Sequence, residues 1–177
     1  MADERLLTCD CFAADVVSIA RDLIGRRLVV HDAERTIAGI IIETEAYGDA
    51  DDPASHAAFR PGGRAAAMSG APGTVYVYSA YGMHPCFNIV TGPIGTASAV
   101  LIRGVWLDGE HIVTSGPGRL TRAMGISPDD HCRMVCGTRF GITVTRQALS
   151  IRATTRIGIS RGVDLPWRFV GSGTESS

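Results

Sequence analysis

Residues 41–47 have the sequence Ile-Ile-Glu-Thr-Glu-Ala-Tyr, in which a hydrophobic run ends in two carboxylates and a tyrosine. Alternate residues of a β-strand point to the same side of the sheet, so the pattern predicts that Glu43, Glu45 and Tyr47 share one face. A carboxylate at the inner end of a buried strand is costly unless it has a partner or a function. This stretch therefore predicts a buried strand that ends in a polar cluster.

The sequence on either side of this strand predicts an α+β fold built on an antiparallel sheet. Apolar spacing over residues 12–24 predicts a helix, and Gly116-Pro117-Gly118 predicts the start of a second, short helix. Residues 48–73 are rich in Gly, Pro, Ala, Asp and Ser and are predicted to form a long loop. We expect one domain over residues 1–170 and a disordered tail over 171–177. Strands are predicted over residues 27–31, 35–47, 74–78, 87–90, 97–103, 141–145, 150–154 and 167–170.

The composition is ordinary for a globular chain except for its basic residues. All 17 are arginine, the chain has no lysine, and the formal net charge is −1. A mechanism that needs a lysine amine, such as a Schiff base, is thereby excluded. Arginine suits phosphate contacts, but a net charge near zero means that any nucleic-acid site must be local. No long apolar run indicates a transmembrane helix, and the N-terminus lacks the pattern of a signal peptide.

The five cysteines are interpreted as ordinary thiols. An odd number of cysteines in an intracellular chain argues against a disulfide framework. Cys132 and Cys136 flank three residues beside His131, a spacing that is wrong for a zinc knuckle. We therefore expect no metal ion and no cofactor. An acidic loop also lacks the ligand spacing of an EF-hand and is interpreted as solvated: Asp49, Asp51 and Asp52.

A tyrosine-rich stretch, Tyr76-Val-Tyr78-Ser-Ala-Tyr81-Gly-Met83, contains three of the four tyrosines of the chain. A core strand with hydroxyls that reach the surface explains Tyr76. Tyr81 and Met83 fall at a predicted turn, where exposed apolar groups are costly in water. An aromatic residue on a turn beside a polar cavity is what a base-flipping protein needs to fill the gap left in the base stack.

Two further positions are typical of sites that hold a negative group. Arg103 ends an apolar strand, where an arginine pairs with a buried carboxylate or clamps a phosphate. The helix start before Arg119 presents free backbone N–H groups that favour a phosphate. Taken alone, Glu43 and Glu45 are more simply explained as partners of arginines at a sheet edge.

Three stretches together resemble the alkyladenine (3-methyladenine) DNA glycosylase family. They are Ile42-Glu-Thr-Glu-Ala-Tyr47 through His56, Thr74-Val-Tyr-Val-Tyr-Ser-Ala-Tyr-Gly-Met-His-Pro-Cys-Phe-Asn88, and Ala99-Val-Leu-Ile-Arg103 followed by Ser115-Gly-Pro-Gly-Arg-Leu120. The similarity spans roughly residues 12–170. It implies a curved antiparallel sheet flanked by helices, with a protruding β-hairpin that inserts into DNA.

The resemblance also implies a role for each matching residue. Glu45 matches the general base that activates a water, Arg103 matches the arginine that positions this water, and Glu43 is left as a structural neighbour paired to an arginine. Tyr81 matches the residue that takes the place of the flipped base, with Met83 close by. The matching base-pocket residues are Tyr47, His56, Tyr78 and Asn88, the last of which crowds the exocyclic amine of guanine. The candidate phosphate contacts are Arg60, Arg64, Gly118, Arg119 and Arg122.

The implied function is that of a monofunctional DNA glycosylase in base excision repair. Such an enzyme flips alkylated or deaminated purines, such as 3-methyladenine, hypoxanthine and ethenoadenine, and hydrolyses the N-glycosidic bond to leave an abasic site. Its partner is double-stranded DNA that contains a damaged purine. We expect a monomer without membrane association, in the bacterial cytoplasm near the nucleoid.

Two alternatives remain open at this point. The first is a catalytically weak protein that binds damaged DNA, because the segment 104–115 after Arg103 is shorter than in the family. The second is a metal-dependent phosphodiesterase that uses Glu43, Glu45 and the acidic loop.

Overall fold

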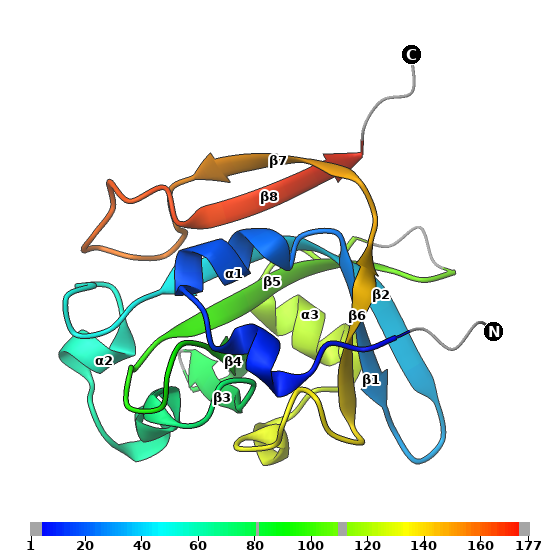
Figure 1. Cartoon of the computed structure of the whole chain (residues 1–177), viewed down its shortest axis with the longest axis horizontal. Helices are drawn as coiled ribbons and strands as arrows, with labels where there is room; N and C mark the ends of the chain where they lie inside the picture. Colours follow the sequence, from blue (N-terminus) through cyan, green and yellow to red (C-terminus); the bar gives the residue numbers. More distant parts are fainter. Residues whose placement is uncertain (1–4, 81, 110–112, 174–177) are drawn as a thin grey trace.

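The computed structural model describes residues 5–80, 82–109 and 113–173 of the 177-residue chain. In this part of the chain, eight strands form one antiparallel sheet in the order β3-β4-β5-β2-β1-β6, with β8 paired to β2 and β7 paired to β8 (Figure 1). The predicted α+β class and antiparallel sheet are confirmed. The strands are β1 (Arg26–His31), β2 (Thr36–Tyr47), β3 (Val75–Ala80), β4 (His84–Val90), β5 (Ala99–Leu107), β6 (Phe140–Arg146), β7 (Leu149–Thr154) and β8 (Arg168–Gly173).

Short helices cover the sheet and connect its strands. Helix α1 (Val16–Asp22) packs on β2, β5 and β8, and helix α3 (Pro117–Met124) packs on β4 and β5. The long loop predicted over residues 48–73 contains helix α2 (His56–Phe59) and the 3-10 helix η2 (Gly63–Ser69). Two further 3-10 helices are η1 (Cys9–Phe12) and η3 (Pro128–Asp130). Within the described residues, no helix is both long and apolar enough to span a membrane.

Strand β2 changes its partner half-way along its length. Its first half pairs with β1, its second half pairs with β8 over residues 43–45, and β5 lies along its other edge. The register with β5 shifts around Glu43, so that Ile42 and Arg103 have no Cα partner there. Such irregularities re-aim side chains and are frequent beside active sites. Here the irregularity brings Arg103 to the carboxylates of β2, with its Nε 3.0 Å from Glu43 and 3.5 Å from Glu45.

The hydrophobic core has a large part and a small part. The large part fills the space between the sheet and α1 and α3, with Phe12, Phe87 and Phe140 almost completely buried. The small part is built around Met68 and Tyr76. Both of these residues line the cavity described below, so the smaller cluster supports the candidate site.

The cysteine prediction was wrong for one pair. Cys9 and Cys136 form a disulfide with their Cα atoms 5.7 Å apart, a separation that suits a bridge. The two residues are 127 positions apart, and counting cysteines cannot reveal that the fold brings such segments together. Cys86 is a buried free thiol, whereas Cys11 and Cys132 are exposed free thiols.

The predicted end of the folded domain also needs correction. Strand β8 runs to Gly173 and pairs with β7 over its whole length, so regular structure continues beyond residue 170. The prediction ended at residue 170 because residues 171–173 are glycine and serine, which are poor strand formers. In the structure, pairing with β7 holds them in the strand. Residues 174–177 lie outside the described residues.

Candidate active site

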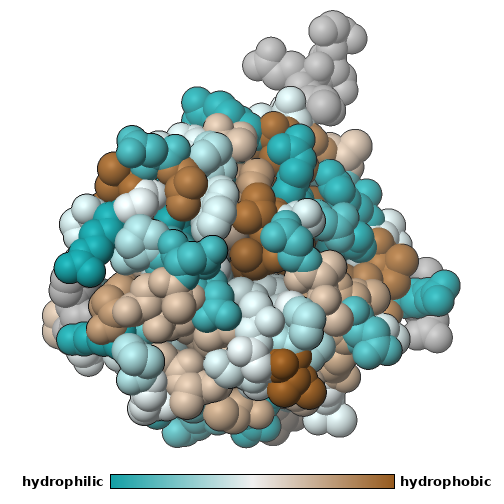
Figure 2. All heavy atoms as spheres, turned by 60° about the vertical axis from the view of Figure 1, so that its left-hand side comes forward, coloured by the Kyte–Doolittle hydropathy of each residue, from teal (hydrophilic) through white to brown (hydrophobic). Residues whose placement is uncertain are grey.

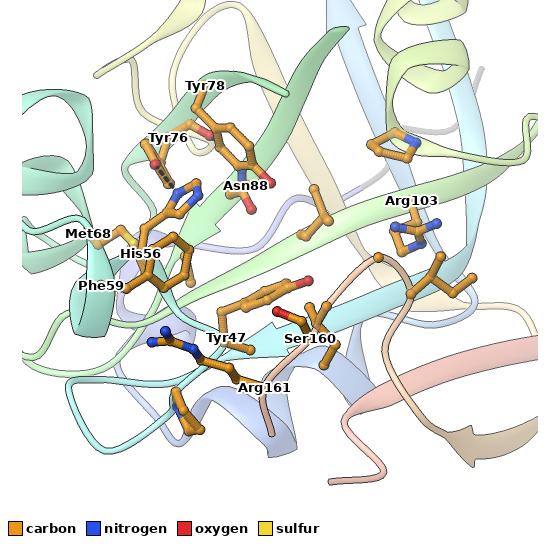
Figure 3. A pocket seen from close by; sticks show the side chains of 18 residues that line it. Tyr47, His56, Phe59, Met68, Tyr76, Tyr78, Asn88, Arg103, Ser160 and Arg161 are labelled. Carbon is orange, nitrogen blue, oxygen red and sulfur yellow. Dashed lines mark hydrogen bonds between the residues drawn. The ribbon is translucent and has the colours of Figure 1, made fainter. Parts of the chain in front are cut away.

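A cavity of about 530 Å³ lies where β2, β3, β4 and β5 meet α2 and the segment 157–161 (Figure 3). This volume falls within the range of roughly 300–1,000 Å³ that is usual for small-molecule sites. Its lining is rich in rings: Tyr47, His56, Phe59, Tyr76 and Tyr78. The predicted pocket residue Asn88 and the predicted catalytic residue Arg103 also line it, so the cavity brings together residues that are far apart in the sequence.

The aromatic side chains face one another across the cavity. Tyr47, at the end of β2, lies opposite Tyr78 of β3 and His56 of α2 (Figure 3). The ring centroids of His56 and Tyr78 are 4.5 Å apart, with an angle of 75° between the rings. The Nδ1 atom of His56 is 2.8 Å from the hydroxyl of Tyr76. This arrangement leaves a slot with an aromatic wall on each side, a shape suited to a planar ring.

His56 is neutral at pH 7 because its surroundings oppose protonation. Partial burial lowers the pKa of His56 below its ordinary value, and the nearby charge of Arg60 lowers it further. Ser55 holds the start of α2 in place, since its hydroxyl accepts a hydrogen bond from the backbone N–H of Ala57. The imidazole therefore contributes a hydrogen-bonding ring to the cavity wall and no positive charge.

The orientation of the Asn88 amide is fixed by two backbone carbonyls. Its Nδ2 donates hydrogen bonds to the carbonyl oxygens of Tyr76 and Cys86, at 3.0 and 3.1 Å. Both hydrogens of the amide are thereby used, and the side chain is 3% exposed. A group held in this way cannot turn aside for a ligand, so it limits the shape of the ring that fits.

Glu45 is fully buried, is not among the residues that line the cavity, and is hydrogen-bonded to Tyr47, which does line it. One carboxylate oxygen, Oε2, accepts a hydrogen bond of 2.8 Å from the Tyr47 hydroxyl, and the other, Oε1, accepts one of 2.7 Å from the backbone N–H of Ile157. Burial raises the pKa of Glu45 above its ordinary value, and the hydrogen bonds and the charge of Arg103 offset only part of this effect. A carboxylate with raised proton affinity is a suitable general base.

The neighbouring carboxylate, Glu43, is held in an ion-pair cluster. Its Oε1 accepts hydrogen bonds from Nε of Arg103 at 3.0 Å and from Nε of Arg168 at 2.7 Å. The prediction that Glu43 pairs with an arginine is confirmed. The shared face of Glu43, Glu45 and Tyr47 is confirmed as well, because Arg103 contacts both carboxylates and Tyr47 donates to Glu45.

The C-terminal side of the site was not predicted from the sequence. Segment 157–161 lines the cavity, and Arg156 beside it is fully buried against Asp52. The interpretation of Asp52 as solvated was therefore wrong, because Arg156 and two backbone N–H groups satisfy its carboxylate. A lone arginine after a strand carries no spacing that points to an aspartate 104 positions away. In the part of the chain that is described, no group of three or more His, Cys, Asp or Glu side chains could hold a metal ion.

The sequence of this chain matches a known protein family over most of its length. Residues 10–175 match the family model of methylpurine-DNA glycosylase. The chain belongs to this family. As a DNA glycosylase, it is an N-glycosyl hydrolase of DNA repair.

Similar proteins from three bacteria carry provisional names as 3-methyladenine DNA glycosylases. The chain is 38% identical over 171 residues to one from Nitrosospira multiformis, a match that covers 89% of this chain and 86% of the relative. It is 40% identical over 177 residues to one from Rhodopseudomonas palustris, with 93% and 84% covered. It is 39% identical over 180 residues to one from Carboxydothermus hydrogenoformans, with 93% and 94% covered.

The turn between β3 and β4 carries the residues predicted to enter DNA. The two strands of this glycosylase pair from Val75 with Ile89 to Ala80 with His84, and Gly82 and Met83 lie in the connection between them. Tyr81 lies outside the described residues. The side chain of Met83 is 74% exposed, and the backbone N–H of Met83 donates to the carbonyl of Ala80.

The predicted phosphate contacts fall on two parts of the surface. Arg60 and Arg64 border a second hollow of about 660 Å³, which shares His56, Tyr76 and Tyr78 with the cavity. Arg119 and Arg122 are exposed on α3. Figure 2 shows polar and apolar side chains intermixed on the side that Figure 1 has at its left, without one large apolar patch.

Two glycines shape the start of α3. Gly116 has φ of 99°, in the left-handed region that glycine adopts without strain. Gly118 lies against the side chain of His84, and a Cβ atom added to it would come within 3.1 Å of the His84 Cβ. These two positions let α3 begin close to the β3–β4 hairpin, with Pro117 at the cavity wall.

Proposed function

We propose that this glycosylase flips alkylated and deaminated purines from double-stranded DNA into the cavity and hydrolyses their N-glycosidic bond with a water activated by Glu45. The observation that carries the proposal is the environment of Glu45. This carboxylate is fully buried, has a raised pKa, and is bonded to Tyr47, a residue that lines the cavity. We assign Arg103, which lines the cavity with its Nε 3.5 Å from Glu45, to hold the same water.

The proposed reaction is a direct hydrolysis in which no covalent bond forms between the enzyme and the sugar. The water oxygen attacks C1′ of the flipped nucleotide, Glu45 takes the proton of the water, and the bond from C1′ to the purine nitrogen breaks. The electron pair of that bond leaves with the purine, so a cationic alkylated base departs as a neutral molecule. A neutral base such as hypoxanthine departs as an anion and takes up one proton, which balances the proton taken by Glu45. Alkylation of the ring makes the purine a better leaving group and weakens its base pair, so both flipping and departure are easier. The products are the free base and an abasic site.

Recognition of the base is assigned to the aromatic slot. Tyr47 stacks on one side of the purine, and His56 and Tyr78 contact the other side, with the backbone of His56 at the purine edge. The electron-rich faces of the tyrosines favour a cationic ring. The fixed amide of Asn88 crowds the exocyclic amine of guanine, which disfavours undamaged guanine.

DNA binding is assigned to the hairpin and the surface arginines. Tyr81 fills the space of the flipped nucleotide, and Met83 lies beside it. Arg60, Arg64, Arg119 and Arg122 contact phosphates, together with the backbone at Gly118. With few such contacts and a net charge of −1, we expect the affinity for DNA to depend moderately on salt. We also expect the protein to act as a monomer.

Base release from defined duplexes tests the proposal. Single duplexes carrying 3-methyladenine, hypoxanthine, ethenoadenine or 7-methylguanine, and an undamaged duplex, are incubated with the wild-type protein and with Glu45→Gln. We expect the wild type to release damaged bases and leave alkali-labile abasic sites. Glu45→Gln should bind the same duplexes without releasing a base.

Two results would contradict the proposal in different ways. Release by Glu45→Gln at the wild-type rate would remove Glu45 from its assigned role. Tight binding of damaged duplexes by the wild type, with no base released from any of them, would favour a lesion-binding protein without catalytic activity. The metal-dependent alternative is disfavoured because Asp52, one of its ligands, is already bound to Arg156.

A further inference from the structure

We propose that Arg156, held by Asp52 on the far side of Tyr47, is a positioning residue that shifts the pocket's preference from cationic toward neutral damaged purines. The inference rests on the proposed function, because it acts through the stacking of a flipped base on Tyr47. Arg156 itself does not contact the substrate. It affects specificity through the ring of Tyr47, on which the flipped base stacks.

The contacts of Arg156 connect several parts of the site. Its Nη1 donates to Asp52 at 2.7 Å and to the carbonyl oxygen of Ala46 at 2.9 Å, and its Nη2 donates to Asp52 at 2.9 Å. Ala46 is the residue between Glu45 and Tyr47 on β2. The next residue along the chain, Ile157, donates its backbone N–H to Glu45. Arg156 therefore fixes the end of β2 that carries both Glu45, the proposed general base, and Tyr47, the proposed stacking ring.

The guanidinium of Arg156 lies over two aromatic rings. Its central carbon is 4.9 Å from the ring centroid of Tyr47 and 5.2 Å from that of Trp167. Among the buried side-chain nitrogen and oxygen atoms of the described residues, the Nε of Arg156 is the one that has no hydrogen-bond partner. The side chain thus forgoes one hydrogen bond in a position where it covers both rings. An arginine placed only to neutralise Asp52 would not need this position.

Arg156 contacts the Tyr47 ring from outside the cavity lining. Tyr47 lines the cavity, and Figure 3 shows its ring facing Tyr78 and His56. Arg156 has a side chain with no exposed surface and is absent from the cavity lining. A base that stacks on the cavity side of Tyr47 is therefore separated from a buried guanidinium by one ring.

A cation behind the ring changes what the front of the ring attracts. The face of a tyrosine ring attracts cations through its negative quadrupole, an effect of roughly 0.5–2 kcal/mol. The Arg156 guanidinium uses this attraction from one side, polarises the ring toward itself and repels a second cation on the other side. Asp52 offsets part of the charge. An N3-alkylated adenine in DNA is cationic and hypoxanthine is neutral, so Arg156 disfavours the first relative to the second.

The selectivity ratio separates this role from a merely structural one. Loosening of the strand end would displace Glu45 and lower the excision rates of all lesions by a similar factor. Loss of the charge behind Tyr47 would act on the cationic lesion alone. The measured quantity is therefore the single-turnover rate for 3-methyladenine divided by the rate for hypoxanthine, in the same duplex sequence and at the same pH.

The test uses Arg156→Met and the double variant Arg156→Met with Asp52→Asn, which removes both charges of the buried Arg156–Asp52 pair. We expect both to raise the ratio by roughly three- to tenfold, which is the rate equivalent of the middle of the cation–π range. Arg156→Lys, which keeps the charge, should stay closer to the wild-type ratio. Because replacing a whole buried ion pair is often tolerated, the double variant keeps the test available if Arg156→Met does not fold.

Arg139→Met is the matched control. Arg139 also pairs with a buried aspartate, Asp130, and its guanidinium carbon lies 5.4 Å from the ring centroid of Phe140, which is not in the cavity lining. This variant should leave the ratio at the wild-type value. Equal losses for both lesions in the Arg156 variants, with no change in ratio, would overturn the inference. A wild type that released neither base would instead overturn the proposed function.

Discussion

Two buried carboxylates, Glu45 and Asp52, lie near Tyr47 in surroundings that differ in their hydrogen-bond donors. Glu45 is 0% exposed and Asp52 is 1% exposed. Burial by itself acts to raise the pKa of each carboxyl group, but the net direction differs between them. At Glu45 burial dominates, and the pKa stays above its ordinary value. At Asp52 the paired hydrogen bonds from Arg156, with the backbone N–H groups of Gly48 and Ala54, outweigh burial and lower the pKa.

The difference teaches that burial alone does not identify a catalytic carboxylate. Asp52 has a bidentate arginine partner that makes the charged form its stable state, which suits a structural anion. Glu45 has the Tyr47 hydroxyl, one backbone N–H, and Arg103 at 3.5 Å. Glu45 therefore has a raised proton affinity, and a general base needs this property.

The first test of this comparison replaces each carboxylate by its amide and measures excision. Glu45→Gln should lower the single-turnover rate on a hypoxanthine duplex by roughly 10²- to 10⁴-fold, the usual contribution of a general base. Asp52→Asn should keep most of the activity of the protein that remains folded, because Asp52 does not line the cavity. Equal losses in the two variants would mean that both carboxylates act in the same way and that the contrast has no functional meaning.

The second test measures the free energy of unfolding of the same variants at pH 7. Asp52→Asn leaves the buried guanidinium of Arg156 without its counter-charge and should cost about 3–5 kcal/mol. Glu45→Gln should have the opposite sign and raise stability. Because the folded pKa of Glu45 is raised, its contribution to stability is present below the unfolded value of 4.5 and is lost as pH rises through the folded value. Urea unfolding gives both numbers, and destabilisation by Glu45→Gln would contradict the raised pKa.

Strand alternation was sufficient to predict one side of the site from the sequence. It placed Glu43, Glu45 and Tyr47 on one face, and the residues themselves are adjacent in the chain. The resemblance to a family then separated the roles of the two carboxylates and gave roles to His56, Tyr78, Asn88 and Arg103, which the fold brings to one cavity. The order of the strands was also predictable, because most of them are local apolar runs bounded by turn residues.

The remaining features depend on contacts between distant segments. The register shift that aims Arg103 at β2 depends on how two strands pair, and the pattern of either strand alone does not contain it. The Asp52–Arg156 pair and the Cys9–Cys136 disulfide join segments more than 100 positions apart. Asp52 is an ordinary loop aspartate in the sequence, and only the three-dimensional structure shows that it binds Arg156, whose guanidinium lies over the ring of Tyr47.

The third test sharpens the comparison through pH. If Glu45 must be deprotonated, excision should fall about tenfold per pH unit below its raised pKa, so the acid limb should lie above the range of an ordinary glutamate. Asp52 has a lowered pKa, so its stabilising charge is lost only as pH falls through a value below 3.8. The protein should therefore lose activity in mild acid while it is still folded. Excision rates and circular dichroism over the same pH series check this, and parallel loss of activity and structure would contradict it.

The smallest expected effect comes from Tyr47→Phe, which removes the hydroxyl that donates to Glu45 and keeps the ring for stacking. This hydroxyl lowers the pKa of Glu45, so its removal should move the acid limb of the excision rate to higher pH. On the plateau above the limb, the rate should change by no more than about tenfold, the equivalent of one hydrogen bond of roughly 0.5–1.5 kcal/mol. Tyr78→Phe is the matched control, because Tyr78 lines the same cavity and is not among the described groups that hydrogen-bond to Glu45. An acid limb that moved equally in both variants would show that the Tyr47 hydroxyl does not tune the base, and the contrast between the two carboxylates would then rest on Arg103 and the backbone alone.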